Sequence, residues 1–240
     1  MPAPTITTSQ LETLLKRMNA LEARVQELEQ GRTSPPRRAA RSDASGAAAT
    51  LDASRWTIPY VTADLEVSET WIELHEPSAR PQLQRLLREV VQTEGPITER
   101  LALDRIRRAW GLKRAGGRVQ EAFDQAVRQL VARALIERVG DALRIPGTEL
   151  EQVRVPSDDD ELSRRGAEDV PLIELSAAIG RAAATLAGPV DEDDLTMRIA
   201  KVFGWTRRGG AIQERLNAAL DHADEQGLVK RSGGSITASR

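Results

Sequence analysis

The stretch EGPITERLALDRIRRAWGLKRAGGRVQEAFDQAV, residues 94–127, decides the fold, because its pattern returns as AGPVDEDDLTMRIAKVFGWTRRGGAIQERLNAAL, residues 187–220. Gly95 aligns with Gly188, an offset of 93 residues (188 − 95), and this offset holds without a gap. It pairs glycines, arginines and apolar residues: Arg105 with Arg198, Gly111 with Gly204, Arg114 with Arg207, Gly116-Gly117 with Gly209-Gly210, and Leu135-Ile136 with Leu228-Val229. Self-similarity at a fixed offset predicts two copies of one domain.

Each copy has the pattern of a helix-turn-helix followed by a β-hairpin. In the first copy, apolar residues at helical spacing predict a helix over 83–91, which stops at Gly95-Pro96. A second helix is expected from Thr98 to Gly111, and a third has its apolar face over 119–131. Alternating residues 135–145 then predict a hairpin with a two-residue turn. Three helices closed by a hairpin make a winged helix.

We therefore predict a mainly α fold with small β-hairpins, in which an N-terminal coiled-coil helix precedes tandem winged helix-turn-helix domains. Segments rich in small, polar or acidic residues separate these parts and predict linkers. The expected organisation is a coiled coil over 1–30, a disordered linker over 31–54, an extension packing on the first domain over 55–82, the first winged helix over 83–146, an acidic linker over 147–170, and the second winged helix over 171–240.

An apolar seam follows Ser9 and Glu12, whose spacing is that of a capping box at the start of a helix. Its members alternate at spacings of three and four, as in a coiled coil: Leu11, Leu14, Met18, Leu21, Val25 and Leu28. So short a helix gains little stability unless the seam is buried. We expect a homo-oligomer, most simply a dimer; the alternative is that the seam docks on the rest of the same chain.

Composition excludes several classes of function. The chain has no cysteine, which rules out disulfides, thiolate zinc sites and thiol nucleophiles. The two histidines, His75 and His222, lack further ligands at suitable spacing, so we expect no enzyme, metal or cofactor. The acidic run Asp191–Asp194 falls where a helix begins, which favours helix capping over Mg²⁺ binding. No long apolar run or leader is recognisable, and we expect a cytoplasmic protein without membrane contact.

Positive charge is concentrated in the first copy. The whole chain has a net charge of −2, but residues 83–146 hold 13 Lys and Arg against 8 Asp and Glu, whereas residues 171–240 hold 9 of each. A helix N-terminus flanked by arginines suits phosphate. The candidate nucleic-acid contacts are Lys113, Arg114, Gly116, Gly117, Arg118, Gln125 and Arg128 in the first copy, with Arg207 and Arg208 in the second. The alternative is that the glycines serve only the turn.

At these residues the chain resembles the domain of unknown function found near the C-terminus of large bacterial superfamily I helicase-like proteins. In that family E-G-P-I, R-I, a-x-G, R-x-G and a final R-I or R-V recur. The second copy keeps the pattern with Ala187 in place of the Glu and Ala211 in place of the Arg. The resemblance implies a winged-helix-like fold in a DNA-processing setting. No helicase core accompanies the motif in this sequence, so ATP hydrolysis is not implied.

Two classes of function remain. The first is a non-enzymatic protein that binds double-stranded DNA, oligomerised by its coiled coil and accessory to a helicase or nuclease. The second is an adaptor that docks onto a larger DNA-processing complex without touching DNA. The third helix of the first copy presents cations, whereas the matching positions of the second are Ala211, Glu214, Ala218 and Asp221. We therefore expect the first copy to carry most of any nucleic-acid affinity.

Overall fold

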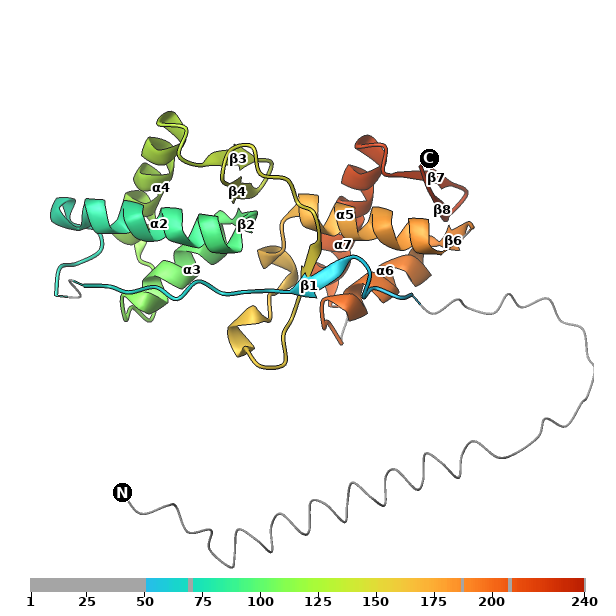
Figure 1. Ribbon diagram of the computed structural model, residues 1–240, viewed down its shortest axis with the longest axis horizontal. Helices are drawn as coiled ribbons and strands as arrows, with labels where there is room; N and C mark the ends of the chain where they lie inside the picture. Colours follow the sequence, from blue (N-terminus) through green and yellow to red (C-terminus); the bar gives the residue numbers. More distant parts are fainter. Residues whose placement is uncertain (1–50, 69–70, 187, 207–208, 240) are drawn as a thin grey trace, which may run out of the picture. The chain divides into compact units, whose positions relative to one another are not determined.

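The computed structural model describes residues 51–68, 71–186, 188–206 and 209–239, which belong to one compact unit spanning 49–240. The expected coiled-coil seam, with Leu11, Leu14, Met18, Leu21, Val25 and Leu28, lies outside the described residues, as do Arg207 and Arg208. Within them the fold consists of six α-helices with small, mostly antiparallel sheets (Figure 1). None of these helices is long and apolar enough to span a membrane.

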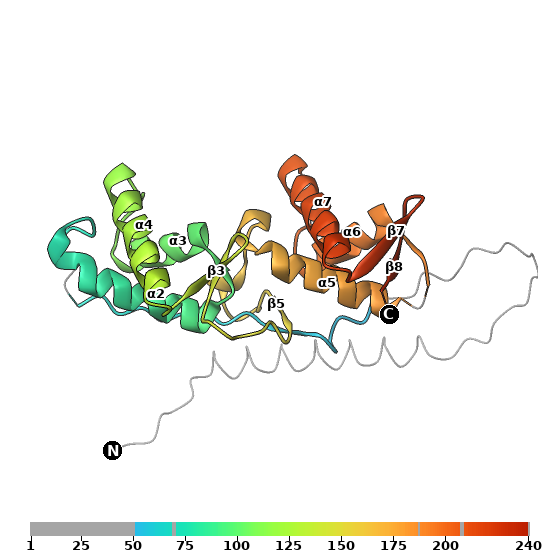
Figure 2. The ribbon, with the colours of Figure 1, turned by 90° about the horizontal axis from the view of Figure 1, so that it is seen from above.

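The first half of the unit runs from α2 to β4. After a short 3-10 helix at Pro77–Ala79, its elements are α2 (Arg80–Glu94), β2 (Ile97–Thr98), α3 (Glu99–Ala109), α4 (Gly117–Ala132), β3 (Glu137–Val139) and β4 (Ala142–Arg144). The helices α3 and α4 pack on α2 (Figure 2). The strands form an antiparallel sheet in the order β2-β4-β3.

Local sequence signals explain where these elements begin and end. The Thr98 hydroxyl accepts a hydrogen bond from the Leu101 N–H at 3.3 Å and so caps α3. Gly111, at φ +76°, ends that helix in a conformation that favours glycine. In the E-G-P-I motif, a Cβ at Gly95 would lie 2.3 Å from the Val91 carbonyl oxygen, so the end of α2 requires glycine there.

The second half, from α5 to β8, has the same order of helices and strands. Its elements are α5 (Leu172–Thr185), β6 (Val190–Asp191), α6 (Glu192–Val202), α7 (Gly210–Glu225), β7 (Val229–Ser232) and β8 (Ser235–Ala238). The sheet order is β6-β8-β7, and both neighbouring pairs are antiparallel. The expected hairpins are therefore present in both halves, β3–β4 around Gly140-Asp141 and β7–β8 around Gly233-Gly234.

Each half has its own hydrophobic core. In the first, Leu86, Ile106 and Phe123 bring α2, α3 and α4 together and are fully buried. In the second, Ile179 and Leu220 do the same for α5 and α7, and Phe203 stacks on Trp205 with ring centroids 5.1 Å apart. Burial of such large apolar side chains stabilises each half by about 1.5–3 kcal/mol per residue.

The segment 55–82 differs from the expected extension on the first domain, because it packs on both halves. Trp56 joins the core of the second half, whereas Leu74 joins that of the first. Between them, β1 (Thr57–Pro59) pairs in parallel with β5 (Val153–Val155). The two tryptophans in this segment have different environments, since Trp71 is 75% exposed while Trp56 is buried.

The segment 147–170 also differs from expectation, since it is not a solvated linker. It contains β5 and two 3-10 helices, Glu161–Ser163 and Ala167–Asp169. Val153 and Val170 are fully buried, and the acidic run serves local structure, with Asp160 capping the Leu162 N–H at 2.8 Å. Arg154 and Arg165 are also buried. A charged side chain is buried when a partner offsets its lost hydration, and such partners lie elsewhere in the sequence.

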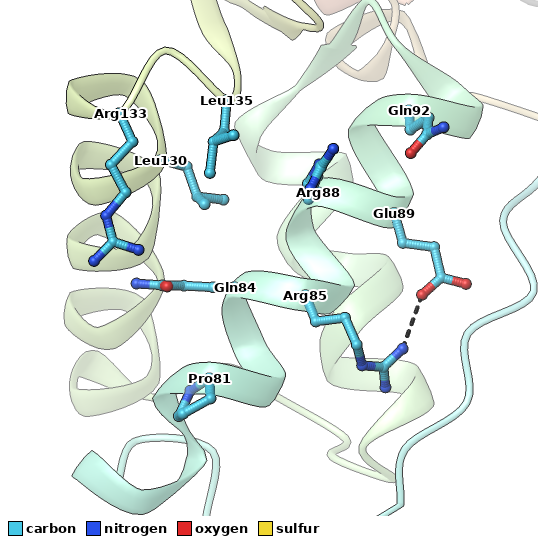
Figure 3. Close-up of a pocket in the computed structure, with 9 residues that line it drawn as sticks. All are labelled: Pro81, Gln84, Arg85, Arg88, Glu89, Gln92, Leu130, Arg133 and Leu135. Carbon is cyan, nitrogen blue, oxygen red and sulfur yellow. Dashed lines mark hydrogen bonds and ion pairs between the residues drawn. The ribbon is translucent and has the colours of Figure 1, made fainter.

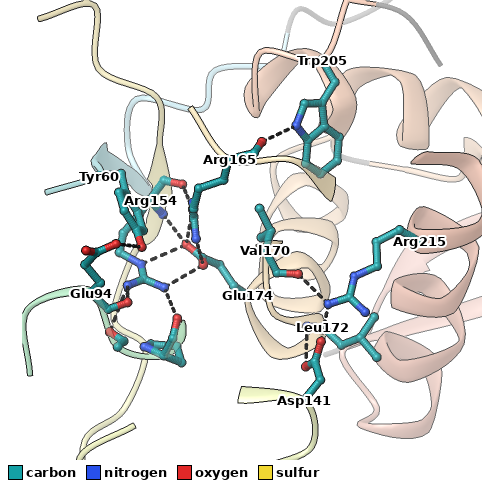
Figure 4. Close-up of polar contacts among 12 residues, drawn as sticks. Tyr60, Glu94, Asp141, Arg154, Arg165, Val170, Leu172, Glu174, Trp205 and Arg215 are labelled. Atoms are coloured by element: carbon teal, nitrogen blue, oxygen red, sulfur yellow. Dashed lines mark hydrogen bonds and ion pairs between the residues drawn. The ribbon is translucent and has the colours of Figure 1, made fainter. Parts of the chain in front are cut away.

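A buried network of ion pairs and hydrogen bonds joins the two halves (Figure 4). The Glu174 carboxylate of α5 accepts hydrogen bonds from Arg154 Nη2 and Arg165 Nη1, each at 2.7 Å. Arg154 also donates from Nη1 to the Glu94 carbonyl oxygen at 2.6 Å and from Nη2 to the Pro96 carbonyl oxygen at 2.7 Å. This one guanidinium therefore connects the C-terminus of α2, where carbonyls lack helical partners, with the start of α5.

The Glu94 side chain forms the other end of this network. Its carboxylate accepts from the Tyr60 hydroxyl at 2.6 Å and from Arg105 Nε at 3.0 Å, and all three side chains are buried. The Arg165 guanidinium lies over the Tyr60 ring, 4.0 Å from its centroid. Burial, together with the Glu94 charge, raises the pKa of Tyr60, which therefore stays a protonated donor. These contacts hold Tyr60, directly after β1, against Glu94 of the first half and against Arg165, which pairs with Glu174 of the second.

The turn of hairpin β3–β4 also contacts the second half. Asp141 Oδ1 accepts from the Leu172 N–H at 3.1 Å, at the start of α5, and Asp141 Oδ2 pairs with Arg215 of α7. Arg215 in turn donates to the Val170 carbonyl oxygen at 2.6 Å. The hairpin tip of the first half is thus held by the second half, and its acidic side chain is already occupied (Figure 4).

Candidate nucleic-acid interface

The turn between α3 and α4 is held by an arginine from the preceding helix. Arg107 Nη1 donates to the carbonyl oxygens of Leu112 and Lys113, at 3.0 and 2.9 Å. The same guanidinium pairs with Asp104 one turn earlier. The turn therefore has a defined backbone course, which leaves the Lys113 and Arg114 side chains exposed.

The start of α4 offers free N–H groups. Gly116 is the N-cap residue, and no side chain caps the helix. Neither Gly116 nor Gly117 has a positive φ, and a Cβ at either position would meet no atom within 4 Å. Neither conformation nor packing therefore requires glycine at these positions. This weighs against the alternative that the two glycines are needed only to form the turn. The uncapped helix end and the open space beside it suit an anion that approaches closely.

Four cations at the turn and along the exposed side of α4 have no partner among the described residues. Lys113, Arg114, Arg118 and Arg128 are exposed, and within the described part of the chain none of them forms a hydrogen bond or ion pair. Most other arginines of the first half are committed to carboxylates: Arg100, Arg105, Arg107, Arg108, Arg138 and Arg144. The uncommitted charge is therefore concentrated at the turn and along α4, where a polyanion would find it.

One predicted contact occupies a different position. Gln125 is half-buried, and its Oε1 accepts from Arg80 Nη2 at 3.2 Å, so it faces α2 and not the exposed side of α4. The exposed side instead carries Glu121 together with Arg128. The Gln125 side chain therefore does not lie on the exposed side of α4. It links α4 to α2 instead.

The corresponding face of α7 has no such cations. Ala211, Glu214 and Ala218 are exposed, and Asp221 pairs with Arg231 of β7 at 2.5 Å. The predicted contacts Arg207 and Arg208 precede this helix, outside the described residues. Among the residues that the structure describes, the exposed face of α7 is neutral to acidic. This agrees with the expected difference in charge between the two copies.

The other candidate sites have structural explanations. Asp191 caps α6 by accepting from the Asp193 and Asp194 N–H groups at 2.9 and 3.1 Å. His222 Nδ1 lies 2.9 Å from the Ser176 hydroxyl, and His75 lies beside Glu73. No group of three or more His, Asp or Glu side chains in the described ranges could hold a metal ion.

Sequence reasoning missed two groups of residues. Arg88 of α2 and Arg133, just after α4, are exposed cations beside one groove, and they are far apart in the sequence. The pairs that join the halves, such as Asp141 with Arg215, were also missed. An outward position on a helical wheel could have identified Arg88 as exposed, but only the packing of α2 on α4 places it near Arg133.

Residues 73–121 match the family described as protein of unknown function (DUF3320). The match covers less than half of the chain and extends from before α2 to the first turn of α4, so that it includes Lys113, Arg114 and Arg118. It is consistent with the helicase-associated domain that the sequence resembles. No curated protein matches the chain, and no solved structure matches it.

Proposed function

We propose that this chain is a non-enzymatic protein that binds double-stranded DNA, and that its two halves are tandem winged-helix-type domains. The first half makes the main contact, through the turn after α3 and the start of α4. The observation that carries the proposal is a set of exposed, unpartnered cations, of which Lys113, Arg114 and Arg118 lie at an uncapped helix N-terminus and Arg128 lies further along the same helix. Guanidinium groups and helix N–H groups are the donors that bind phosphate oxygens in duplexes.

The proposed contact has two parts, one that positions the duplex by its phosphates and one that contacts base edges. Lys113 and Arg114 in the turn hold a phosphate, together with the free N–H groups of Gly117 and Arg118. Arg128 lies further along the exposed side of α4 and reaches toward the groove, where base edges are accessible. The tip of hairpin β3–β4 is engaged by Arg215, so it adds no contact, and the second half serves instead to brace the first.

A second candidate function, protein docking, rests on the corresponding turn of the second half. There a shallow pocket of about 440 Å³ is lined by Met197, Ala200, Lys201, Gly204, Trp205 and Thr206. Met197 is 41% exposed, and it occupies the position that Asp104 holds in the first half. An apolar pocket suits a protein side chain better than phosphate. In this alternative the chain is an adaptor within a helicase or nuclease complex.

Replacing Arg114, Arg118 and Arg128 together by Ala is expected to weaken duplex binding. Each lost phosphate contact should flatten the slope of log affinity against log salt by about one unit. Fluorescence anisotropy with a labelled duplex measures both quantities. The matched control is Arg207 and Arg208 replaced by Ala, which should change affinity much less. Equal impairment of the two variants would contradict the difference between the copies, and unchanged binding in both would favour the adaptor.

We also propose that the seam from Leu11 to Leu28 makes the chain an oligomer, most simply a dimer. Apolar side chains at coiled-coil spacing gain stability only when a partner helix covers them. Light scattering of the full chain should therefore give the mass of a dimer, and deletion of residues 1–30 should give a monomer. A full-length chain that is monomeric at micromolar concentration would contradict this, and would favour docking of the seam on its own chain.

A further inference from the structure

A groove of about 550 Å³ lies between α2 and the C-terminal end of α4 (Figure 3). Its floor is apolar, formed by Leu130 and Leu135. Arg133 rises on the side of α4 and Arg88 on the side of α2, with the two leucines between them. Gln84 and Gln92 add amide groups along α2. The groove thus has two cationic walls and a narrow apolar base.

The two wall arginines are uncommitted. Arg88 and Arg133 are exposed, and neither forms a hydrogen bond or ion pair with any other residue that the structure describes. A third arginine beside them, Arg85, is neutralised, because it pairs with Glu89 at 3.1 Å and donates to the Glu66 carbonyl oxygen at 2.7 Å. The groove therefore keeps two free guanidinium groups, which are available to bind an anion.

The shared order of elements does not by itself produce this groove, because the matching helices of the second half, α5 and α7, pack closely together. Ala177 and Ala178 of α5 stand where α2 has Gln84 and Arg85. The Ser176 hydroxyl contacts the Ala219 carbonyl oxygen of α7 at 3.1 Å, and a Cβ at Gly180 would lie 3.2 Å from Leu228 Cβ. Small residues thus let these helices pack closely, whereas long polar side chains line the space between α2 and α4.

The cation that corresponds to Arg88 is also committed in the second half. Arg181 donates to the Leu150 and Glu151 carbonyl oxygens, at 3.2 and 2.6 Å, and Gln226 stands where the first half has Arg133. Among the described residues, the matching positions of the second half therefore lack the two free guanidinium groups that line this groove. The first half, which has them, is the half that carries the candidate interface.

We propose that the groove binds the phosphodiester backbone of DNA, as a second contact of the duplex held by the start of α4. This inference rests on the proposed function. Positions 118, 125, 129 and 133 follow one another at spacings of seven, four and four, so they form a row along one flank of α4. The row leads from Arg118 at the turn to Arg133 in the groove. A duplex bound at the Arg118 end of this row would bring the phosphates of one of its strands toward the Arg133 end.

The side chains of the groove favour backbone over bases. Guanidinium groups bind phosphate oxygens in a bidentate manner, and glutamine amides donate to the same oxygens. The groove lining has no aromatic residue on which a base could stack. A duplex phosphate therefore fits the groove better than an unpaired base does.

The test is the double variant Arg88→Ala, Arg133→Ala in the full chain, measured with a labelled duplex by fluorescence anisotropy. Loss of two phosphate contacts should flatten the salt slope by about two units and weaken binding by about tenfold or more at low salt. The matched control is Arg164→Ala, Lys230→Ala, which removes two exposed cations outside the first half and should leave the slope unchanged. Both variants should melt at the wild-type temperature, because the replaced side chains are exposed.

The outcomes separate this inference from the proposed function. If wild type binds duplex and the Arg88 and Arg133 variant binds equally well, the groove assignment is overturned while DNA binding stands. If wild type does not bind duplex at all, both are overturned. If the variant loses binding to a polyglutamate peptide while its duplex affinity is unchanged, the groove belongs to an acidic protein partner, and the phosphate assignment fails.

Discussion

Glu174→Gln is expected to destabilise the chain by about 3–5 kcal/mol, although the two side chains have nearly the same shape. The carboxylate accepts hydrogen bonds from both Arg154 and Arg165, and it is fully buried. Removal of its charge leaves two buried guanidinium groups with no carboxylate between them. Because Arg154 also holds the end of α2, the loss affects both halves and should appear as one cooperative transition.

Urea unfolding followed by circular dichroism measures this loss. The matched control is Asp221→Asn, which removes a carboxylate whose side chain is 63% exposed in its pair with Arg231. Solvent screens such a pair, so the control should change the free energy of unfolding by less than about 1 kcal/mol. Equal effects from the two substitutions would show that the network does not join the halves energetically.

The same network predicts the response to acid. Burial alone would raise the pKa of Glu174, but the charges of Arg165 and Arg154, with their hydrogen bonds, hold it below its ordinary value of 4.5. A carboxyl with a lowered pKa contributes stability that is complete above its unfolded value and is lost as the pH falls through the folded value. Wild-type stability should therefore decline below about pH 4.5, and Glu174→Gln should lack this component of the decline.

The sequence could predict elements whose causes are local. The cap at Thr98 and the two-residue turn at Gly140-Asp141 depend on neighbours a few residues away, and both are present. The repeated pattern also predicted the same order of helices and strands in the two halves. Such features require only short-range hydrogen bonds and one apolar face per helix.

Segments whose partners are distant could not be predicted in this way. Arg154 and Arg165 lie in a polar stretch that has the composition of a linker. Their burial is explained by distant partners: Glu174, Tyr60 and the carbonyl oxygens at the end of α2. Asp141 is a common turn residue, so nothing in its local sequence pointed to Arg215. In each case the deciding contact is between residues far apart in the sequence, and the spacing of apolar residues along a helix or strand does not predict such contacts.

The candidate interface shows the same division. Exposure of Arg118 and Arg128 followed from the apolar face of α4, because a helix that buries one side exposes the other. The position of Gln125 against Arg80 did not follow, since it depends on how α2 crosses α4. For the same reason the groove between Arg88 and Arg133 had no counterpart in the sequence pattern.

Salt is expected to have the largest effect on binding. Each phosphate contact contributes about −0.9 to the slope of log affinity against log salt. The four free cations of the turn and of α4, Lys113, Arg114, Arg118 and Arg128, then give a slope of about −3.6. Affinity for a duplex should fall roughly a hundredfold between about 50 and 200 mM salt. Contacts from the groove between α2 and α4 would make the slope steeper.

The most direct test is the affinity of the full chain for a labelled duplex, measured by fluorescence anisotropy from about 50 to 200 mM KCl. Binding through α4 predicts a straight line with a slope of about −3.6 or steeper, reduced by about three units when Arg114, Arg118 and Arg128 are replaced by Ala. Absence of binding at the lowest salt, or an affinity that does not change with salt, would contradict the proposal that this protein binds DNA.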